Sequence, residues 1–160
     1  MTAGFACYER FFTHDDFTLE TDSALEAVEC WAFFDPSFSE HQPFCVSLRY
    51  DHYGMPGGYY RNLYITDVEK TYTGDNFQGK PVLHYRFNWQ DPMGVEGGTP
   101  FWLEIYSEAD YFNWAARDEG NLYWQWNQFD KAAFFRLLGT PEDSRIQPAS
   151  WGEIKAGFSD

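Results

Sequence analysis

The sequence predicts an α+β domain, in which an antiparallel, meander-like sheet of about five strands carries three or four short helices mainly on one face. Three observations predict this class: segments whose apolar residues alternate, segments whose apolar residues recur at helical spacing after a capping residue, and glycine-containing turns between them. The length of 160 residues fits a single domain spanning residues 1–160. Because 21% of the residues are aromatic, we expect a packed core throughout.

Five segments have the pattern of half-buried strands, with apolar side chains at every second position. These segments are residues 44–50, 59–66, 82–89, 101–106 and 122–127. The turn at residues 54–58 predicts that the first two segments form a hairpin. Residues 91–100 contain several glycines and predict a loop.

The helices are predicted from capping residues. Ser23 and Glu26 form a capping box, which predicts a helix over residues 23–34 that ends before Pro36. The other expected helices run from Ser107 to about Arg117, over residues 131–138 after Asp130, and as short turns over residues 140–143 and 150–153.

The net charge narrows the classes of partner. The chain carries 25 acidic and 11 basic side chains, for a formal charge of −14. Such a domain repels phosphate groups, so neither direct nucleic-acid binding nor an anionic membrane surface is expected. A basic protein surface or a cation is the favoured charged partner. The alternative is that the charge only maintains solubility.

The N-terminus lacks a basic segment and an apolar run of signal-peptide length, and no segment is long and apolar enough to span a bilayer. The three cysteines, Cys7, Cys30 and Cys45, are odd in number and widely spaced. These features predict a cytoplasmic protein whose thiols are buried as small apolar groups.

No motif predicts a catalytic, metal or cofactor site. Residues 74–81 nearly match a phosphate-binding loop, but Pro81 replaces the hydroxyl residue and a strand pattern follows, so we expect a hairpin turn or a loop turn. The histidines are not spaced as metal ligands. A Cys45–His84 nucleophile pair is conceivable, but no oxyanion-hole loop accompanies it.

The acidic excess is concentrated in residues 1–48, which contain nine acidic residues and one basic residue, Arg10. Asp22, Glu26 and Glu29 would form one stripe of the first predicted helix, where adjacent like charges cost a few tenths of a kcal/mol per pair. A basic partner would offset that cost, whereas the alternative is a solvated helix face. The residues predicted to bind a partner are Asp15, Asp16, Glu20, Asp22, Glu26 and Glu29.

Aromatic residues also occupy the strand positions that alternate with the expected core positions. They are Tyr60, Tyr64, Trp102 and Tyr106. Either helices cover this face of the sheet, or its rings are exposed for a protein interface or for stacking on a sugar or another planar ligand.

Three functional hypotheses follow. In size, charge and composition the chain resembles acidic phage anti-defence proteins and bacterial toxin-immunity proteins. The first hypothesis is therefore a binding protein that inhibits a basic, nucleic-acid-handling protein through an acidic and aromatic surface. The second is a small-ligand or carbohydrate-binding domain with an aromatic-lined sheet. The third is an enzyme with a dispersed site, which no motif supports.

Overall fold

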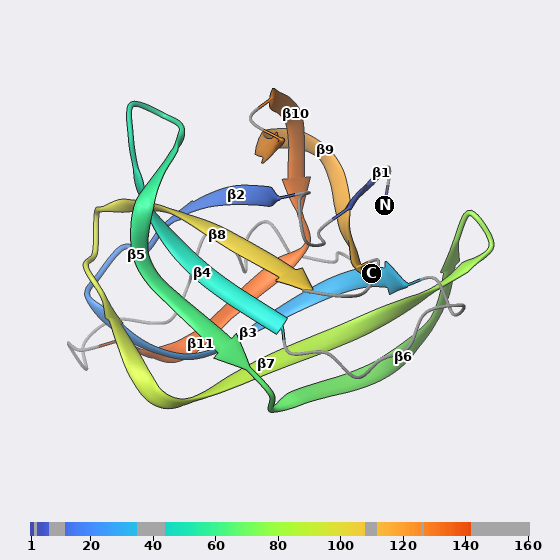
Figure 1. Ribbon diagram of the computed structural model, residues 1–160, viewed down its shortest axis with the longest axis horizontal. Coiled ribbons are helices and arrows are strands. Elements are labelled where there is room, and N and C mark those ends of the chain that lie inside the picture. Colours follow the sequence, from blue (N-terminus) through green and yellow to red (C-terminus); the bar gives the residue numbers. More distant parts are fainter. Residues whose placement is uncertain (2, 7–11, 35–43, 108–111, 126, 142–160) are drawn as a thin grey trace.

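The protein is all-β, and the α+β prediction is wrong (Figure 1). The computed structural model describes residues 1, 3–6, 12–34, 44–107, 112–125 and 127–141, and none of these residues is helical. They form eleven strands: β1 (Ala3–Ala6), β2 (Thr13–Thr18), β3 (Ser23–Phe34), β4 (Phe44–Asp51), β5 (Pro56–Ile65), β6 (Val68–Phe77), β7 (Lys80–Val95), β8 (Pro100–Ser107), β9 (Phe112–Trp124), β10 (Asn127–Ala133) and β11 (Phe135–Pro141).

All the described strands belong to one antiparallel sheet rather than to a meander of five. The main path through the sheet is β5-β4-β8-β2-β9-β3-β7-β6, while β1 and β10 pair with β9, and β11 pairs with β3. Strands that are distant in sequence therefore lie side by side, as β2 does with β8.

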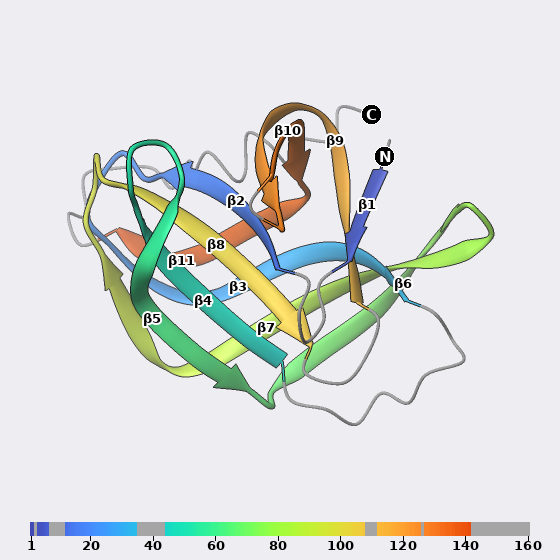
Figure 2. The ribbon, with the colours of Figure 1, turned by 45° about the horizontal axis from the view of Figure 1, so that its top comes forward.

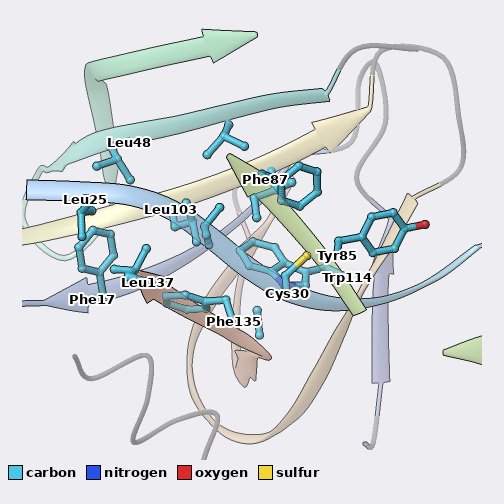
Figure 3. Packing of buried hydrophobic residues seen from close by; sticks show 14 of the residues in the cluster. Phe17, Leu25, Cys30, Leu48, Tyr85, Phe87, Leu103, Trp114, Phe135 and Leu137 are labelled. Atoms are coloured by element: carbon cyan, nitrogen blue, oxygen red, sulfur yellow. The ribbon is translucent and has the colours of Figure 1, made fainter. Parts of the chain in front are cut away.

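The sheet curls into a half-barrel around its own core (Figures 1 and 2). Phe44 on β4 and Phe87 on β7 are separated along the sheet by β8, β2, β9 and β3, yet their ring centroids are 5.0 Å apart. Such a contact requires the inner faces of the two ends of the sheet to meet. Figure 3 shows buried residues of this core packed together, among them Leu48 on β4, Leu103 on β8 and Phe135 on β11.

One hydrogen bond joins the two sides of the curl. The hydroxyl of Tyr60 on β5 donates to the carbonyl oxygen of Gly94 on β7 over 2.6 Å. Tyr60 faces inward because it is the extra residue of a β-bulge, in which Leu48 pairs with Arg61 and Arg49 pairs with Tyr59.

The predicted hairpin at residues 54–58 is confirmed, and residues 74–81 form a hairpin turn rather than a loop turn. Strands β4 and β5 pair across the turn that contains Gly54. Strands β6 and β7 pair across Gln78 and Gly79, whose φ angles of 51° and 78° suit a two-residue turn with both φ values positive. The near-match to a phosphate loop is therefore a hairpin turn. The loop predicted over residues 91–100 is shorter than expected, because β7 continues to Val95.

The first predicted helix is strand β3, and a register shift explains the error. A bulge between Leu25 and Ala27 interrupts the two-residue alternation, so the apolar positions fit a helical period. The Ser23 hydroxyl donates to the Thr21 carbonyl oxygen over 3.1 Å and caps no helix.

The helices predicted after Ser107 and over residues 131–138 are also strands where they are described. In β9, Phe112, Trp114 and Ala116 belong to the core at every second position. Asp130, expected to cap a helix, instead accepts a hydrogen bond from the Gly120 amide over 3.2 Å. Thr140 and Pro141 belong to β11, while the short helix predicted over residues 150–153 lies outside the described residues.

Candidate functional site

The six carboxylates predicted to bind a partner differ in accessibility. Glu20, Asp22 and Glu26 are exposed, Asp16 is half-buried, and Asp15 and Glu29 are buried. The predicted helical stripe does not exist, because β3 is a strand.

Two chain connections bring exposed carboxylates together at one end of the half-barrel. Residues 19–22 link β2 to β3, and residues 96–99 link β7 to β8, both at the left of Figure 1. The Gly97 amide donates to the Asp22 carboxylate over 2.8 Å, and the Gly98 amide donates to the Leu19 carbonyl oxygen over 2.8 Å. The two connections therefore touch.

Gly97 shows how closely they approach. A Cβ atom at this position would lie 2.4 Å from the Thr21 Cα atom, so a larger residue would push the connections apart. Glu96 precedes this glycine and is exposed. We call the exposed carboxylates of Glu20, Asp22, Glu26 and Glu96 the acidic end.

The described residues do not neutralise the acidic end through ion pairs. Residues 12–34 and 87–107, which contain all of it, include no Lys or Arg. Within the described chain, none of its four carboxylates forms an ion pair. Among the described residues no ion pair relieves the repulsion among these groups, and a basic partner would relieve it.

Asp15 and Glu29 serve the fold instead. The buried Asp15 carboxylate accepts a hydrogen bond from the Ala133 amide over 3.0 Å, which ties β2 to β10. Glu29 lies within 3.6 Å of a guanidinium nitrogen of Arg86 on β7 and of Arg136 on β11, and within 3.5 Å of His84 Nε2. These neighbours compensate its charge, so it contributes little to an acidic surface.

The four predicted aromatic residues do not form one surface. Tyr60 faces the core, where its ring packs against Tyr50 and Phe101 at centroid distances of 5.2 and 5.1 Å. Trp102 is buried, and its indole nitrogen donates to Asp51 over 2.9 Å. Tyr106 is half-buried, whereas Tyr64 is 63% exposed. Tyr64 alone is an openly exposed member of the set.

A buried polar network that the sequence analysis missed occupies the outer face of β2, β4 and β8. His14 Nε2 lies 2.5 Å from Glu104 Oε2, and Arg49 Nε donates to the same oxygen over 3.1 Å. The Arg49 guanidinium also donates to the Gly57 carbonyl oxygen and stacks 3.8 Å from the ring centroid of Tyr59.

Among the described residues, this network is the group of side chains that most resembles a catalytic acid–base site. His14 is 1% exposed and Glu104 is 0% exposed, so neither side chain offers a solvent-facing atom to a substrate. Glu104 Oε1 has no hydrogen-bond partner in the described chain, which leaves part of its burial cost uncompensated. The arrangement therefore acts as a structural charge network. No local motif could have predicted it, since three separate strands supply its members.

A second polar group extends the outer face toward β5. The Cys45 thiol and the Ser47 hydroxyl both donate to Asn62 Oδ1, over 2.6 and 2.8 Å. The pKa of the Tyr106 hydroxyl is raised, mainly because the group is partly buried and secondly because it forms a hydrogen bond with Cys45. Burial also raises the pKa of Tyr59, and the nearby Glu104 charge adds to this effect. Cys45 is thus buried as predicted, but as a hydrogen-bonding group, and it does not pair with His84.

The described residues show no arrangement of three or more His, Cys, Asp or Glu side chains that could hold a metal ion. That part of the chain also includes no helix able to cross a membrane.

No protein-family model, curated protein or solved structure matches this chain. Its function is therefore inferred from the geometry alone.

Proposed function

We propose that the protein is a cytoplasmic, acidic binding protein that docks its acidic end on a basic surface of another protein and inhibits it, as anti-defence and immunity proteins do. The supporting observation is that Glu20, Asp22 and Glu96 lie on two touching connections and Glu26 lies at the start of β3, in segments of the chain that contain no Lys or Arg. A nucleic-acid-handling protein is the favoured target class, because its functional surface is basic.

The charge distribution supports rapid association with such a target. A patch of one sign within a chain of net charge −14 attracts a basic surface over a Debye length of about 10 Å at 0.1 M salt. Steering of this kind raises association rate constants by roughly 10- to 1,000-fold, and the gain falls steeply as salt increases.

The test begins with affinity capture of the partner, followed by association kinetics across a salt series. A variant carrying Glu20→Gln, Asp22→Asn, Glu26→Gln and Glu96→Gln removes the acidic end, while the amide oxygen introduced by Asp22→Asn still offers an acceptor to the Gly97 amide. We expect the association rate constant to fall about tenfold or more and to lose most of its salt dependence.

A matched control changes the net charge equally at other places. Asp67→Asn, Glu69→Gln, Asp118→Asn and Glu119→Gln neutralise four exposed carboxylates outside the acidic end. We expect this variant to retain most of the association rate. An equal loss in both variants would mean that overall charge, rather than the acidic end, drives binding. Unchanged binding in the first variant would exclude the acidic end as the docking surface.

A further inference from the structure

The hairpin formed by β4 and β5 projects from the sheet at the upper left of Figure 1. Among the described residues, seven large hydrophobic side chains are exposed, and four of them belong to this hairpin: Tyr50, Tyr53, Met55 and Tyr59. Residues 52–60 contain no Asp, Glu, Lys or Arg. We call residues 50–59 the tyrosine hairpin. Its composition, rich in Tyr and poor in charge, is typical of the core of a protein interface.

The exposed side chains lie on both faces of the tyrosine hairpin. Tyr50 lies on the core side, where its ring packs 6.0 Å from that of Phe101. Tyr59 lies on the outer side, where its ring stacks on the Arg49 guanidinium. Both tyrosines are still about half exposed, and Tyr53 at the turn between them is 91% exposed. A partner could bury all three rings only by surrounding the hairpin, so the shape fits a recess better than a flat surface.

Tyr53 adopts a backbone conformation that tyrosine does not favour. It has a φ of 55° and Gly54 has a φ of 78°, in a turn where His52 and Met55 exchange backbone hydrogen bonds of 2.8 and 3.2 Å. Asn, Asp and Gly are the usual residues at such positions, and a bulky residue there is an outlier. Within the described chain, the aromatic contact of Tyr53 is with its neighbour His52, 4.8 Å between centroids. Packing of the core therefore does not explain a tyrosine at this turn, whereas a binding role does.

The turn is held in place by polar contacts at its base. The two carboxylate oxygens of Asp51 accept hydrogen bonds from the Trp102 indole over 2.9 Å and from the Gly54 amide over 3.0 Å. The Arg49 guanidinium donates to the Gly57 carbonyl oxygen over 3.0 Å. A hairpin that is fixed before binding loses little conformational entropy in a complex, which favours affinity.

Two contacts place the tyrosine hairpin beside the acidic end. The Tyr50 ring packs against Phe101, and the hydroxyl of Tyr60, the next residue after the hairpin, donates to the Gly94 carbonyl oxygen. Gly94 and Phe101 flank the connection of residues 96–99, which carries Glu96. A protein whose basic surface covers the acidic end is therefore within reach of the hairpin.

We propose that the tyrosine hairpin anchors the complex, with Tyr53 inserted into an apolar recess of the partner protein next to the basic surface that the acidic end attracts. This inference rests on the proposed function, because it takes the same partner as its target. The two surfaces have different kinetic roles. Long-range attraction by the acidic end determines how fast the complex forms, whereas a buried aromatic ring determines how slowly it dissociates.

The test uses the partner captured in the preceding experiment and measures the association and dissociation rate constants separately. Tyr53→Asn removes the ring and introduces a residue that tolerates a positive φ. We expect the dissociation rate constant to rise about tenfold or more, while the association rate constant and its salt dependence change by less than about twofold.

The urea midpoint separates binding from folding. Tyr53→Asn should leave this midpoint unchanged or raise it, because Asn suits the turn better than Tyr does. Weaker binding without a loss of stability is a result that a purely structural role of Tyr53 would not produce. Met55→Gln, at a side chain 45% exposed, is a second variant of the same hairpin and should raise the dissociation rate constant severalfold.

The matched control is Tyr72→Asn, the same chemical change at a side chain 54% exposed on β6, outside the hairpin. It should leave both rate constants unchanged. An unchanged dissociation rate in Tyr53→Asn, or an equal rise in Tyr72→Asn, would overturn the anchoring role and leave the acidic end as the docking surface. Unchanged association of the variant that lacks the acidic end would instead overturn the proposed function. Capture of no basic protein would overturn both.

Discussion

Tyr60 and Gly94 join the two sides of the curled sheet through a single hydrogen bond of 2.6 Å from the phenol hydroxyl to the backbone carbonyl oxygen. Tyr60→Phe removes this bond and keeps the ring packing against Phe101. We expect the free energy of unfolding to fall by about 0.5–1.5 kcal/mol in urea titrations. Tyr64→Phe, which removes a hydroxyl from a side chain 63% exposed, is the control and should change little. An equal effect of the two substitutions would show that the Tyr60 bond contributes nothing.

Glu104 is predicted to be essential for stability, because it balances Arg49 and contacts His14 in the buried network. Glu104→Gln leaves the Arg49 charge without its partner, and loss of one member of a buried ion pair costs about 3–5 kcal/mol. Glu69→Gln is the comparison, since this side chain is 67% exposed and should contribute less than about 1 kcal/mol. Chemical denaturation measures both, and comparable small losses would contradict the structural role of the network.

The raised pKa of Tyr106 predicts that the folded protein loses stability at alkaline pH. Below pH 10, its hydroxyl is protonated in both the folded and unfolded states, and the stability is fully present. Above pH 10 the unfolded tyrosine ionises, whereas the folded residue, whose pKa is raised, keeps its proton. Unfolding then releases a proton, so stability falls as pH rises, by up to about 1.4 kcal/mol per pH unit for one group.

Tyr106→Phe should therefore flatten the decline in stability above pH 10, as measured by urea unfolding at a series of pH values. Tyr59, whose pKa is also raised, contributes in the same direction and leaves some slope in this variant. Tyr53→Phe, at a side chain 91% exposed, should leave the profile unchanged. A Tyr106→Phe profile that coincides with that of the unmodified protein would refute the assignment.

Gly139 permits the pairing of β11 with β3. A Cβ atom there would lie 2.2 Å from the Ala24 carbonyl oxygen and 2.8 Å from the Leu25 Cα atom, so backbone atoms would have to move. We expect Gly139→Ala to lower the unfolding free energy by about 1–3 kcal/mol. Gly58→Ala is the matched control, because a Cβ atom at that position would meet nothing within 4 Å. Thermal unfolding compares the two, and a harmless Gly139→Ala would argue against this close approach.

The strands with a clear two-residue alternation were predictable from the sequence. In β4, Phe44, Val46 and Leu48 face the core, while Cys45 and Ser47 face the polar network, so the two faces differ in chemistry. This difference between the two faces appears in the sequence as an alternation of apolar and polar residues, from which a strand can be predicted.

Strand β3 lacks that contrast. Val28 and Ala32 are buried on the core face, but Phe33 on the opposite face is only 7% exposed. When both faces exclude water, the alternation disappears, and the bulge at Leu25 shifts what remains toward a helical spacing. The capping signal at Ser23 then favoured the wrong element.

The candidate site was predictable only in part. Sequence position identified Glu20, Asp22 and Glu26, and each is exposed. Glu96 was missed because its proximity depends on contact between Gly97 and Thr21, residues far apart in the chain.

The pairing of β11 with β3 also determines when the molecule can complete its fold. Strand β3 ends at Phe34, whereas its neighbour β11 begins at Phe135, so a ribosome must synthesise most of the chain before this edge of β3 is covered. Pairings between such distant segments carry a large loop-closure cost before they contribute stability, and they slow folding. We therefore expect the nascent chain to expose the apolar residues of β3 until synthesis has passed Pro141. During this time a chaperone is expected to bind the exposed segment.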